Sequence, residues 1–366
     1  MNGVFSSELE RYSLVFDFSV LKGKTVFVTG ATGNVGSVVV KFLLALNRFC
    51  ASNIKIVCLA RSMSRAQVVF GPDLAFLTVV VGDVLNNIAF DGVVDYIIHG
   101  ANITDSIFYT QNPVDTIITI ISGTKCMLDF AREKKVRGFV YLSSMEVYGT
   151  LTSDCLEENS YGHIDFLSTR SSYSEGKRMA ECLCHAYAMQ YGVRCMCARL
   201  AQLVGVGIAV SDTRFPSFLV RSIIQKKDVV LQTDGSSVRN SIYTLDAVTG
   251  ILFVLLFGMS GESYNVSAAD SSVSIAKTAQ IVLEELHSDS RLVFDIKENS
   301  YAPTTCINLS NKKLRALGWT EKTSYIDSYK KLYAYLLEAG GEANFKITTP
   351  TDLEKFAEIQ AREVKS

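Results

Sequence analysis

A tyrosine and a lysine four residues apart, Tyr173 and Lys177, are the residues of this chain best suited to chemistry. On a helix, residues with this spacing lie on the same face. An ammonium group beside a phenol favours the phenolate, so we expect Lys177 to lower the pKa of Tyr173 from about 10 toward neutrality. Such a tyrosine can exchange a proton with a sugar hydroxyl while a hydride leaves or joins the same carbon. The spacing alone also fits an exposed helical pair, so the interpretation depends on the surrounding elements.

A glycine-rich turn lies far upstream of this pair, between a strand predicted at 25–29 and an apolar helix predicted at 37–46. The turn has the pattern G-x-x-G-x-x-G. Its first glycine permits a tight turn, the second lets backbone N–H groups approach a pyrophosphate, and the third allows close helix packing. The helix N-terminus favours phosphate. The strand, turn and helix together predict a dinucleotide site formed by Gly30, Thr32, Gly33, Asn34, Val35 and Gly36.

The end of the second predicted strand, at 54–59, is where such folds recognise the adenosine ribose. The residues that follow are Ala60, Arg61 and Ser62, with no acidic side chain. An acid would accept the ribose hydroxyls and repel a 2′-phosphate, whereas an arginine and a serine can bind that phosphate. Arg61 and Ser62 therefore favour NADP over NAD. An Arg61 that stacks on adenine or lies in solvent is the alternative, and it leaves NAD open.

Strand-like and helix-like segments alternate from Lys24 onward. Their continuous Val and Ile runs are typical of strands buried on both faces. The alternation predicts an α/β fold with a Rossmann-type, doubly wound parallel sheet. The expected strands are 25–29, 54–59, 77–81, 94–99, 138–142 and 194–200, and the expected helices include 37–46, 113–134 and 173–191.

Past residue 200 the alternation becomes irregular and Gly and Ser are common, which predicts a smaller mixed α/β lobe for the substrate. The ends of the chain have the character of appendages. We expect an N-terminal arm at 1–21, an NAD(P)-binding domain at 22–200, a substrate lobe at 201–345 and a helical tail at 346–366.

The composition is that of a globular protein and argues against several classes of partner. The 366 residues are 48% hydrophobic and 20% charged, and the net charge of −1 predicts no surface for nucleic acid or an anionic membrane. Nine scattered cysteines predict no metal site and a reducing, cytoplasmic location. No signal peptide is expected at the start, and the longest apolar run, 251–257, is too short to span a bilayer.

Together these motifs make the chain resemble the extended short-chain dehydrogenase/reductases, specifically their nucleotide-sugar epimerase, dehydratase and decarboxylase group. The resemblance covers about residues 22–335 and implies bound NAD(P) and a nucleoside-diphosphate sugar as substrate. The matching motifs, in order, are the glycine turn, Gly82-Asp83-Val84, His99-Gly100-Ala101, the loop from Tyr141 to Gly149, the Tyr173/Lys177 pair, Arg199-Leu200 and the segment from Gly235 to Tyr243.

The resemblance also implies roles for the matching residues. Ser144 would hydrogen-bond the sugar hydroxyl, Tyr173 would act as the base, and Lys177 would bind the nicotinamide ribose. Oxidation at the sugar C4 would give a 4-keto sugar that can epimerise, lose water, lose carbon dioxide or be released. Asp83, Val84, Gly100 and Ala101 would contact the cofactor, and Met145, Arg170, Gln202, Arg214 and Arg239 would contact the substrate.

The pair Met145-Glu146, next to Ser144, departs from the Asp-Glu pair of sugar 4,6-dehydratases. A thioether cannot donate the proton that the Asp provides, so an ordinary dehydratase is disfavoured. Glu146, counted here as catalytic, and Arg170 are similar to their counterparts in UDP-glucuronate decarboxylases, although Gln202 departs from that pattern. A Glu146 that only caps the loop is an alternative, as are structural ion pairs for Arg170 and Arg214.

We therefore expect a cytoplasmic nucleotide-sugar epimerase or decarboxylase, and the resemblance implies a homodimer through the helices at 113–134 and 173–191. Three alternatives stay open. An atypical dehydratase would lose water from the sugar, and an NADPH-dependent 4-keto-sugar reductase, suggested by Arg61, would consume NADPH. A non-catalytic NADP-binding regulator would bind cofactor without turnover.

Overall fold

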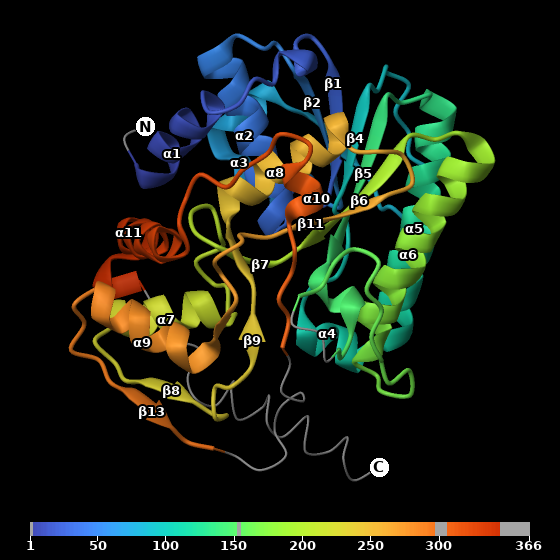
Figure 1. Ribbon diagram of the computed structural model, residues 1–366. Coiled ribbons are helices and arrows are strands. Elements are labelled where there is room, and N and C mark those ends of the chain that lie inside the picture. The colour runs from blue at the N-terminus through green and yellow to red at the C-terminus, as the bar shows by residue number, and fades with distance from the viewer. Residues whose placement is uncertain (1–2, 152–154, 297–305, 345–366) are drawn as a thin grey trace.

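The computed structural model describes residues 3–151, 155–296 and 306–344, and the tail predicted at 346–366 lies outside them. Its centre is a sheet of seven strands, all parallel to their neighbours, in the order β11-β6-β5-β4-β1-β2-β3 (Figure 1). The predicted Rossmann-type α/β fold is confirmed. The strands are β1 (Thr25–Thr29), β2 (Lys55–Ala60), β3 (Thr78–Val81), β4 (Tyr96–His99), β5 (Gly138–Ser144), β6 (Cys195–Leu200) and β11 (Ser263–Val266).

Successive residues of the strands enter two different apolar clusters. On β1, Val26 and Val28 belong to the cluster that contains the helices α2 (Asn34–Cys50) and α8 (Thr244–Phe257). Phe27, which lies between them, belongs to the cluster that contains α5 (Pro113–Lys134) and α6 (Ser171–Tyr191). Apart from the partly exposed edge strand β3, the sheet is therefore buried on both faces, as its continuous apolar runs predict.

The central sheet also takes in residues from beyond position 200, which differs from the predicted boundary of the lobe. Nearly every residue of α8 is buried, because a helix that is apolar on all sides must be covered. The strand after it, β11, pairs with β6 in the register Ser263 to Cys197. The described residues of the predicted 201–345 segment therefore contribute both to the central sheet and to the smaller lobe.

The smaller lobe is built from short strand pairs and helices around a third apolar cluster. β7 pairs with β10 in parallel, β8 with β13 in parallel, and β9 with β12 in antiparallel orientation. The elements are β7 (Gln202–Val204), α7 (Phe215–Ile224), β8 (Val229–Leu231), β9 (Val238–Arg239), β10 (Ser241–Tyr243), β12 (Val273–Ser274), α9 (Ile275–Glu285), β13 (Leu292–Phe294), α10 (Lys312–Arg315) and α11 (Tyr325–Asn344).

The N-terminal helix α1 (Val4–Ser13) is packed into the fold and is not an appendage. It contacts α2 and α8 of the central domain and α11 of the lobe (Figure 1). Tyr12 is fully buried, and its hydroxyl donates to Asp246 Oδ1 at 2.9 Å and lies 2.7 Å from Thr323 Oγ1. The predicted arm thus ties the two parts of the molecule together.

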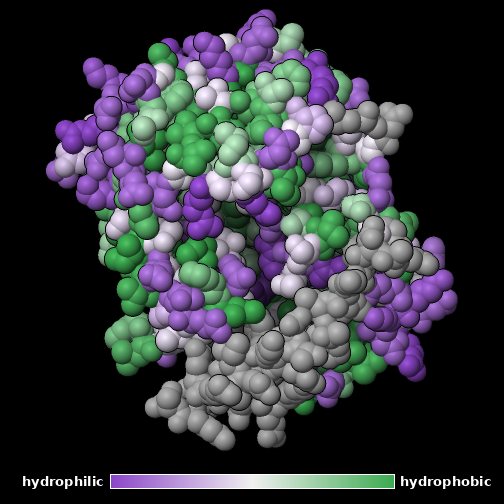
Figure 2. Space-filling view, turned by 180° about the vertical axis from the view of Figure 1, so that it is seen from behind, coloured by the Kyte–Doolittle hydropathy of each residue, from purple (hydrophilic) through white to green (hydrophobic). Residues whose placement is uncertain are grey.

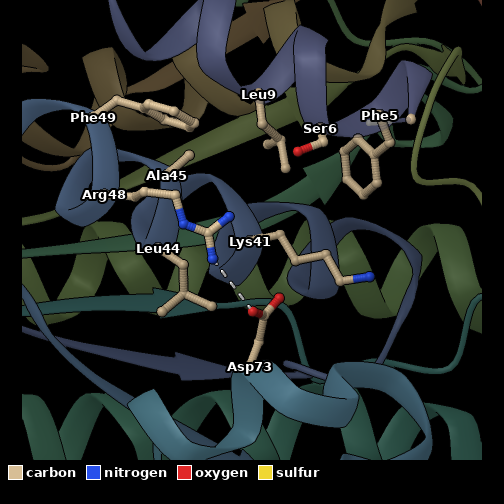
Figure 3. Close-up of a pocket in the computed structure, with 10 residues that line it drawn as sticks. Phe5, Ser6, Leu9, Lys41, Leu44, Ala45, Arg48, Phe49 and Asp73 are labelled. Carbon is tan, nitrogen blue, oxygen red and sulfur yellow. Dashed lines mark ion pairs between the residues drawn. The ribbon is translucent and has the colours of Figure 1, made fainter. Parts of the chain in front are cut away.

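A pocket of about 310 Å³ lies between α1 and the C-terminal half of α2 (Figure 3). Arg48 of α2 points toward Asp73 of the 3-10 helix η2 (Gly71–Phe76), 3.7 Å away. Because the glycine turn lies at the other end of α2, this pocket is separate from the predicted dinucleotide site. Its lining consists of Gly3, Phe5, Ser6, Leu9, Lys41, Leu44, Ala45, Arg48, Phe49 and Asp73.

Candidate active site

The glycine turn joins β1 to α2 with the backbone that a dinucleotide site requires. Gly30 has a φ of +66°, and a Cβ there would lie 2.5 Å from the carbonyl oxygen of Gly100. A Cβ on Gly36 would collide with the carbonyl of Gly30, so only glycine allows α2 to start this close to the turn. Gly33 is the N-cap of α2, and no side chain caps the helix, which leaves its first N–H groups for a phosphate. Thr32, Asn34 and Val35 complete the turn.

Arg61 and Ser62 directly follow β2, as predicted. Arg61 is exposed. Ser62 is the N-cap of α3 (Met63–Phe70), where its hydroxyl accepts a hydrogen bond from the backbone N–H of Arg65 at 3.1 Å. Arg65, whose N–H donates this bond, carries a second guanidinium group four residues after Arg61 in the sequence.

The other predicted cofactor residues follow β3 and β4 at the same edge of the sheet. The Asp83 carboxylate accepts a hydrogen bond from the backbone N–H of Leu85 at 2.9 Å, which fixes the loop. Val84 packs into the core that contains α5. Gly100 lies against the glycine turn, and the N–H of Ala101 donates to Thr29 Oγ1 at 3.2 Å. The ends of β1, β3 and β4 thus bring these residues to one edge of the sheet beside the glycine turn, and this edge is the predicted cofactor cradle.

Tyr173 and Lys177 both lie buried on the first turns of α6, on one face, as their spacing predicts. The Lys177 ammonium donates to the carbonyl of Leu142 at 2.6 Å. With the amide of Asn102 turned so that its oxygen faces Lys177, that oxygen accepts a second hydrogen bond at 3.1 Å. The Nζ atom also lies 5.6 Å from the centre of the Tyr173 ring. The α6 helix thus presents both groups at the end of β5.

The prediction that Lys177 lowers the pKa of Tyr173 is wrong for this structure. Burial raises the pKa of Tyr173 above its usual value, the charge of Glu146 raises it further, and hydrogen bonding to Ser144 lowers it in part. Burial also lowers the pKa of Lys177, to about 7. The Lys177 ammonium attracts a phenolate, but burial away from water disfavours the charged forms of both Tyr173 and Lys177, and this cost is the larger effect.

Ser144 and Glu146 follow at the end of β5, around the 3-10 helix η3 (Met145–Tyr148). Ser144 Oγ caps η3 by accepting from the Glu146 backbone N–H at 3.2 Å. The Glu146 carboxylate accepts from Ser174 Oγ at 3.3 Å and lies 3.8 Å from Arg170 Nη2. The loop cap is therefore Ser144, and the Glu146 carboxylate faces α6. Met145, predicted to contact the substrate, is only 7% exposed and belongs to the apolar cluster on the α2 side.

Three predicted arginines come from three different elements and meet near Tyr173 and Glu146. Arg214, at the start of α7, donates from Nε to Asp212 Oδ1 at 2.7 Å, while its buried Nη2 has no partner among the described residues. Arg239 on β9 likewise has a buried Nε without a partner in that part of the chain. Burial lowers the pKa of Arg239, and the charge of Glu146 raises it. Arg214 Nη2 and Arg239 Nε therefore keep hydrogen-bonding capacity that no described residue uses, although Asp212 and Glu146 lie near the two guanidinium groups.

Two further residues from the matching motifs have structural contacts. Arg199 on β6 forms an ion pair with Glu181 at 2.7 Å and donates to the hydroxyl of Tyr148 at 2.9 Å. The backbone N–H of Gln202 donates to the carbonyl of Asn240 at 3.1 Å, where β7 meets β10.

Seen from behind, the molecule is hollowed near its centre, and hydrophilic side chains gather in this hollow (Figure 2).

Sequence reasoning missed Tyr109, on the short helix α4 (Ser106–Gln111). Its ring stacks on Tyr173 with the centroids 5.1 Å apart and an interplanar angle of 16°. It also missed that His99 is buried between Thr29 and Thr124, with ring nitrogens 2.7 and 3.3 Å from their hydroxyls. Burial and the nearby Lys177 charge lower the pKa of His99 to about 3, so it is neutral. No sequence spacing connects Tyr109 with the distant Tyr173.

The described residues contain neither a candidate membrane-spanning helix nor a candidate metal-binding cluster. No described helix combines the length and the apolar character needed to cross a bilayer. Across the same residues, no cluster of three or more His, Cys, Asp or Glu side chains is arranged to hold a metal ion.

Comparison with known proteins identifies a family whose model matches most of this chain. The model of the NAD dependent epimerase/dehydratase family matches residues 26–267. UDP-glucuronic acid decarboxylase 5 of Arabidopsis thaliana is 33% identical over 159 residues, which is 43% of this chain and 46% of that protein. The chain thus spans about half the length of the curated relatives it matches first.

Solved structures share the fold. UDP-glucose 4-epimerase from Thermotoga maritima, solved with UDP-glucose, superposes with a TM-score of 0.74 at 18% identity, over 86% of this chain and 99% of that one. UDP-glucuronic acid 4-epimerase from Bacillus cereus, solved with UDP-glucuronic acid and NAD, gives a TM-score of 0.70 at 19% identity, with the same coverage. At these identities the likeness establishes the fold.

Proposed function

We propose a function for this chain, which belongs to the NAD dependent epimerase/dehydratase family. It is an enzyme that oxidises a nucleoside-diphosphate sugar at C4. It then converts the resulting 4-keto intermediate, as an epimerase or a decarboxylase does. One observation carries the proposal: among the described residues, one buried guanidinium nitrogen of Arg214 (Nη2) and one of Arg239 (Nε) have no partner, and they lie near Tyr173 and Glu146. A buried, unpaired guanidinium is costly unless a ligand pairs with it. A diphosphate offers oxygens that suit two such forks.

The cofactor cradle adds the redox chemistry. The turn at Gly30 and Gly36 would hold a dinucleotide, and the nicotinamide supplies a reversible hydride acceptor when bound. Tyr173 would take the proton of the sugar hydroxyl, because its phenol lies beside Ser144, the last residue of β5. Ser144 would orient that hydroxyl, since it already hydrogen-bonds the phenol. Lys177 would hold the ribose side of the site, with Leu142 fixing its ammonium.

Within this class we favour decarboxylation, on the residues around Glu146. A carboxylate attached to C5 of a 4-keto sugar is readily lost as carbon dioxide, because the neighbouring C4 ketone takes up the electron pair of the broken bond as an enolate, which is then protonated at C5. Arg170, whose Nη2 lies 3.8 Å from Glu146 and whose guanidinium lies 5.7 Å from the ring centre of Tyr109, the neighbour of Tyr173, would pair with such a carboxylate. The relatives named UDP-glucuronic acid decarboxylase support this choice.

The test is incubation with UDP-, GDP-, CDP- and dTDP-sugars, including uronic acids, followed by mass spectrometry and NMR. A product lighter by carbon dioxide supports decarboxylation, and a product of unchanged mass with inverted stereochemistry supports epimerisation. A product lighter by water would establish the atypical dehydratase instead. Stoichiometric loss of NADPH absorbance with a 4-keto sugar would establish the reductase, and cofactor binding without any turnover would overturn the enzyme proposal.

For the cofactor we propose NADP rather than NAD, because Arg61 and Ser62 replace an acid at the end of β2. Arg61→Ala should weaken NADPH binding about 10- to 100-fold, the effect of a charged hydrogen bond, and leave NADH binding nearly unchanged. Titration of protein fluorescence with each cofactor measures both affinities. Equal losses for NADH and NADPH would contradict the preference.

We further propose a cytoplasmic homodimer whose interface is formed by α5 and α6 of each subunit. No disulfide joins cysteines of the described residues, which suits a reducing compartment. Apolar side chains are exposed on both helices, and their burial in a partner would be favourable: Val114, Ile117, Ile118, Met179 and Met189. Light scattering of purified protein measures the mass, and charged substitutions at Ile118 and Met179 should give a monomer.

A further inference from the structure

We propose that Tyr109 is a positioning residue for the catalytic tyrosine: its ring holds the Tyr173 phenol in place, and its hydroxyl contacts the bound sugar nucleotide. The near-parallel stack, with centroids 5.1 Å apart and 16° between planes, is the observation that carries this inference. It deepens the proposed function and rests on Tyr173 acting as the base.

The backbone that carries Tyr109 is fixed to the catalytic helix. The hydroxyl of Ser172, the residue before Tyr173, donates to the Tyr109 carbonyl at 3.1 Å. Asp105 caps α4 by accepting from the N–H groups of Ile107 and Phe108 at 2.9 and 3.1 Å. A tyrosine has only two side-chain torsions, so fixing its backbone and burying its ring leaves it little freedom.

The two stacked rings lie between two cations. The Arg170 guanidinium carbon is 5.7 Å from the centre of the Tyr109 ring, and Lys177 Nζ is 5.6 Å from the centre of the Tyr173 ring. Both contacts are within the range of cation–π attraction. The order along the site is therefore Arg170, Tyr109, Tyr173 and Lys177, and a change in the Tyr109 ring removes support from the Tyr173 ring on one side.

The Tyr109 hydroxyl makes no hydrogen bond within the described part of the chain, although the residue is 3% exposed. The charges that act on it are those of Glu146, Arg170 and Arg239. The ring is buried, but the hydroxyl oxygen is not one of the fully buried polar atoms that lack a partner in that part of the chain, so it is open to a ligand beside these groups. The sugar nucleotide that would neutralise the arginines also offers the hydroxyl or phosphate oxygen that this phenol lacks.

The stack itself can be tested without any turnover. Protein labelled with 3-fluorotyrosine gives a fluorine NMR signal for Tyr173 that is assigned by its loss in Tyr173→Phe. Tyr109→Leu should move this signal, because the ring current of a stacked neighbour is lost, and Tyr109→Phe should move it much less. Phe108→Leu, an aromatic-to-leucine change at an exposed position of the same helix, is the matched control. An unmoved Tyr173 signal in Tyr109→Leu would overturn the inference.

Kinetics with the sugar nucleotide found by the substrate panel then separate the ring from the hydroxyl. Tyr109→Leu should lower kcat about 10- to 100-fold and shift the midpoint of the pH–rate profile to lower pH, because water reaches the phenol. Tyr109→Phe should restore kcat and raise KM about 2- to 10-fold, the effect of one lost hydrogen bond. Tyr109→Met gives the same comparison if the leucine variant does not fold. Wild-type kinetics in both Leu and Phe variants would contradict the inference, whereas a wild-type enzyme without turnover would contradict only the proposed function.

Discussion

Two buried clusters of this protein contain tyrosine, carboxylate and cationic side chains, and they differ in how completely those groups are paired. The arm cluster consists of Glu8, Tyr12, Tyr243 and Asp246, where α1 meets the lobe. There Glu8 accepts from Tyr243 at 2.9 Å and from Lys331 at 2.7 Å. Asp246 accepts from the hydroxyl of Tyr12 and from the backbone N–H groups of Lys322 and Thr323.

The active-site cluster, consisting of Tyr109, Glu146, Tyr173 and Arg239, is paired incompletely. Arg239 Nε lacks any partner among the described residues, and the Arg170–Glu146 distance of 3.8 Å is long for an ion pair. Similar residues thus stabilise the fold in one place and leave binding capacity in the other. Unpaired buried groups cost about 1–3 kcal/mol each, so their presence points to a ligand and not to folding.

The largest effect is expected when the active-site phenol is removed. Tyr173→Phe should lower kcat by more than about 1000-fold, because proton transfer from the sugar hydroxyl is lost, while cofactor binding and the melting temperature change little. Steady-state kinetics and cofactor titration measure both. Tyr187→Phe, on the same helix with its hydroxyl on Asp129, is the control and should keep its activity. Substantial activity in Tyr173→Phe would exclude this tyrosine as the base.

The next effect sharpens the contrast between binding and stability. Arg239→Gln should weaken UDP binding about 10- to 100-fold, as loss of a charged hydrogen bond does, without lowering the free energy of unfolding. Calorimetry with UDP and urea unfolding make the two measurements. Arg291→Gln is the control, since Arg291 is exposed and pairs with Asp228 at the surface. Lost stability with unchanged affinity would assign Arg239 to the fold.

The arm cluster should respond in the opposite way. Tyr12→Phe removes two buried hydrogen bonds and should cost about 1–3 kcal/mol of unfolding free energy, with kcat unchanged. Tyr161→Phe changes an exposed tyrosine and serves as the control for urea unfolding. A Tyr12→Phe variant as stable as wild type would mean that the cluster does not hold α1.

The smallest effect is a pH dependence of stability that comes from Asp246. Burial raises the pKa of Asp246 to about 7, well above the ordinary value of 3.8. The folded protein therefore holds this proton between about pH 4 and pH 7 while the unfolded chain releases it, so the contribution of Asp246 to stability falls as the pH rises through that window. The difference in unfolding free energy between wild type and Asp246→Asn should decrease from pH 5 to pH 7. A difference that is constant with pH would contradict the raised pKa.

The sequence sufficed to predict the half of the candidate site that depends on local backbone. Gly30 and Gly36 are required by contacts within one turn, and Tyr173 and Lys177 share a face because of helix periodicity, so spacing alone located them. The strand boundaries were predicted to within a few residues, since continuous apolar runs mark strands buried on both faces. Residues 244–266 were placed in the wrong part, because nothing in their pattern shows that β11 pairs with β6.

The chain by itself thus determined which groups can do the chemistry and that a dinucleotide turn precedes them. Only the tertiary structure decided their state and their neighbours. Burial, and not the nearby ammonium, sets the pKa of Tyr173, because desolvation depends on what the whole fold places around the phenol. The stacking of Tyr109 on that phenol and the meeting of Arg170, Arg214 and Arg239 join residues from separate elements, and such contacts follow from packing that no sequence spacing encodes.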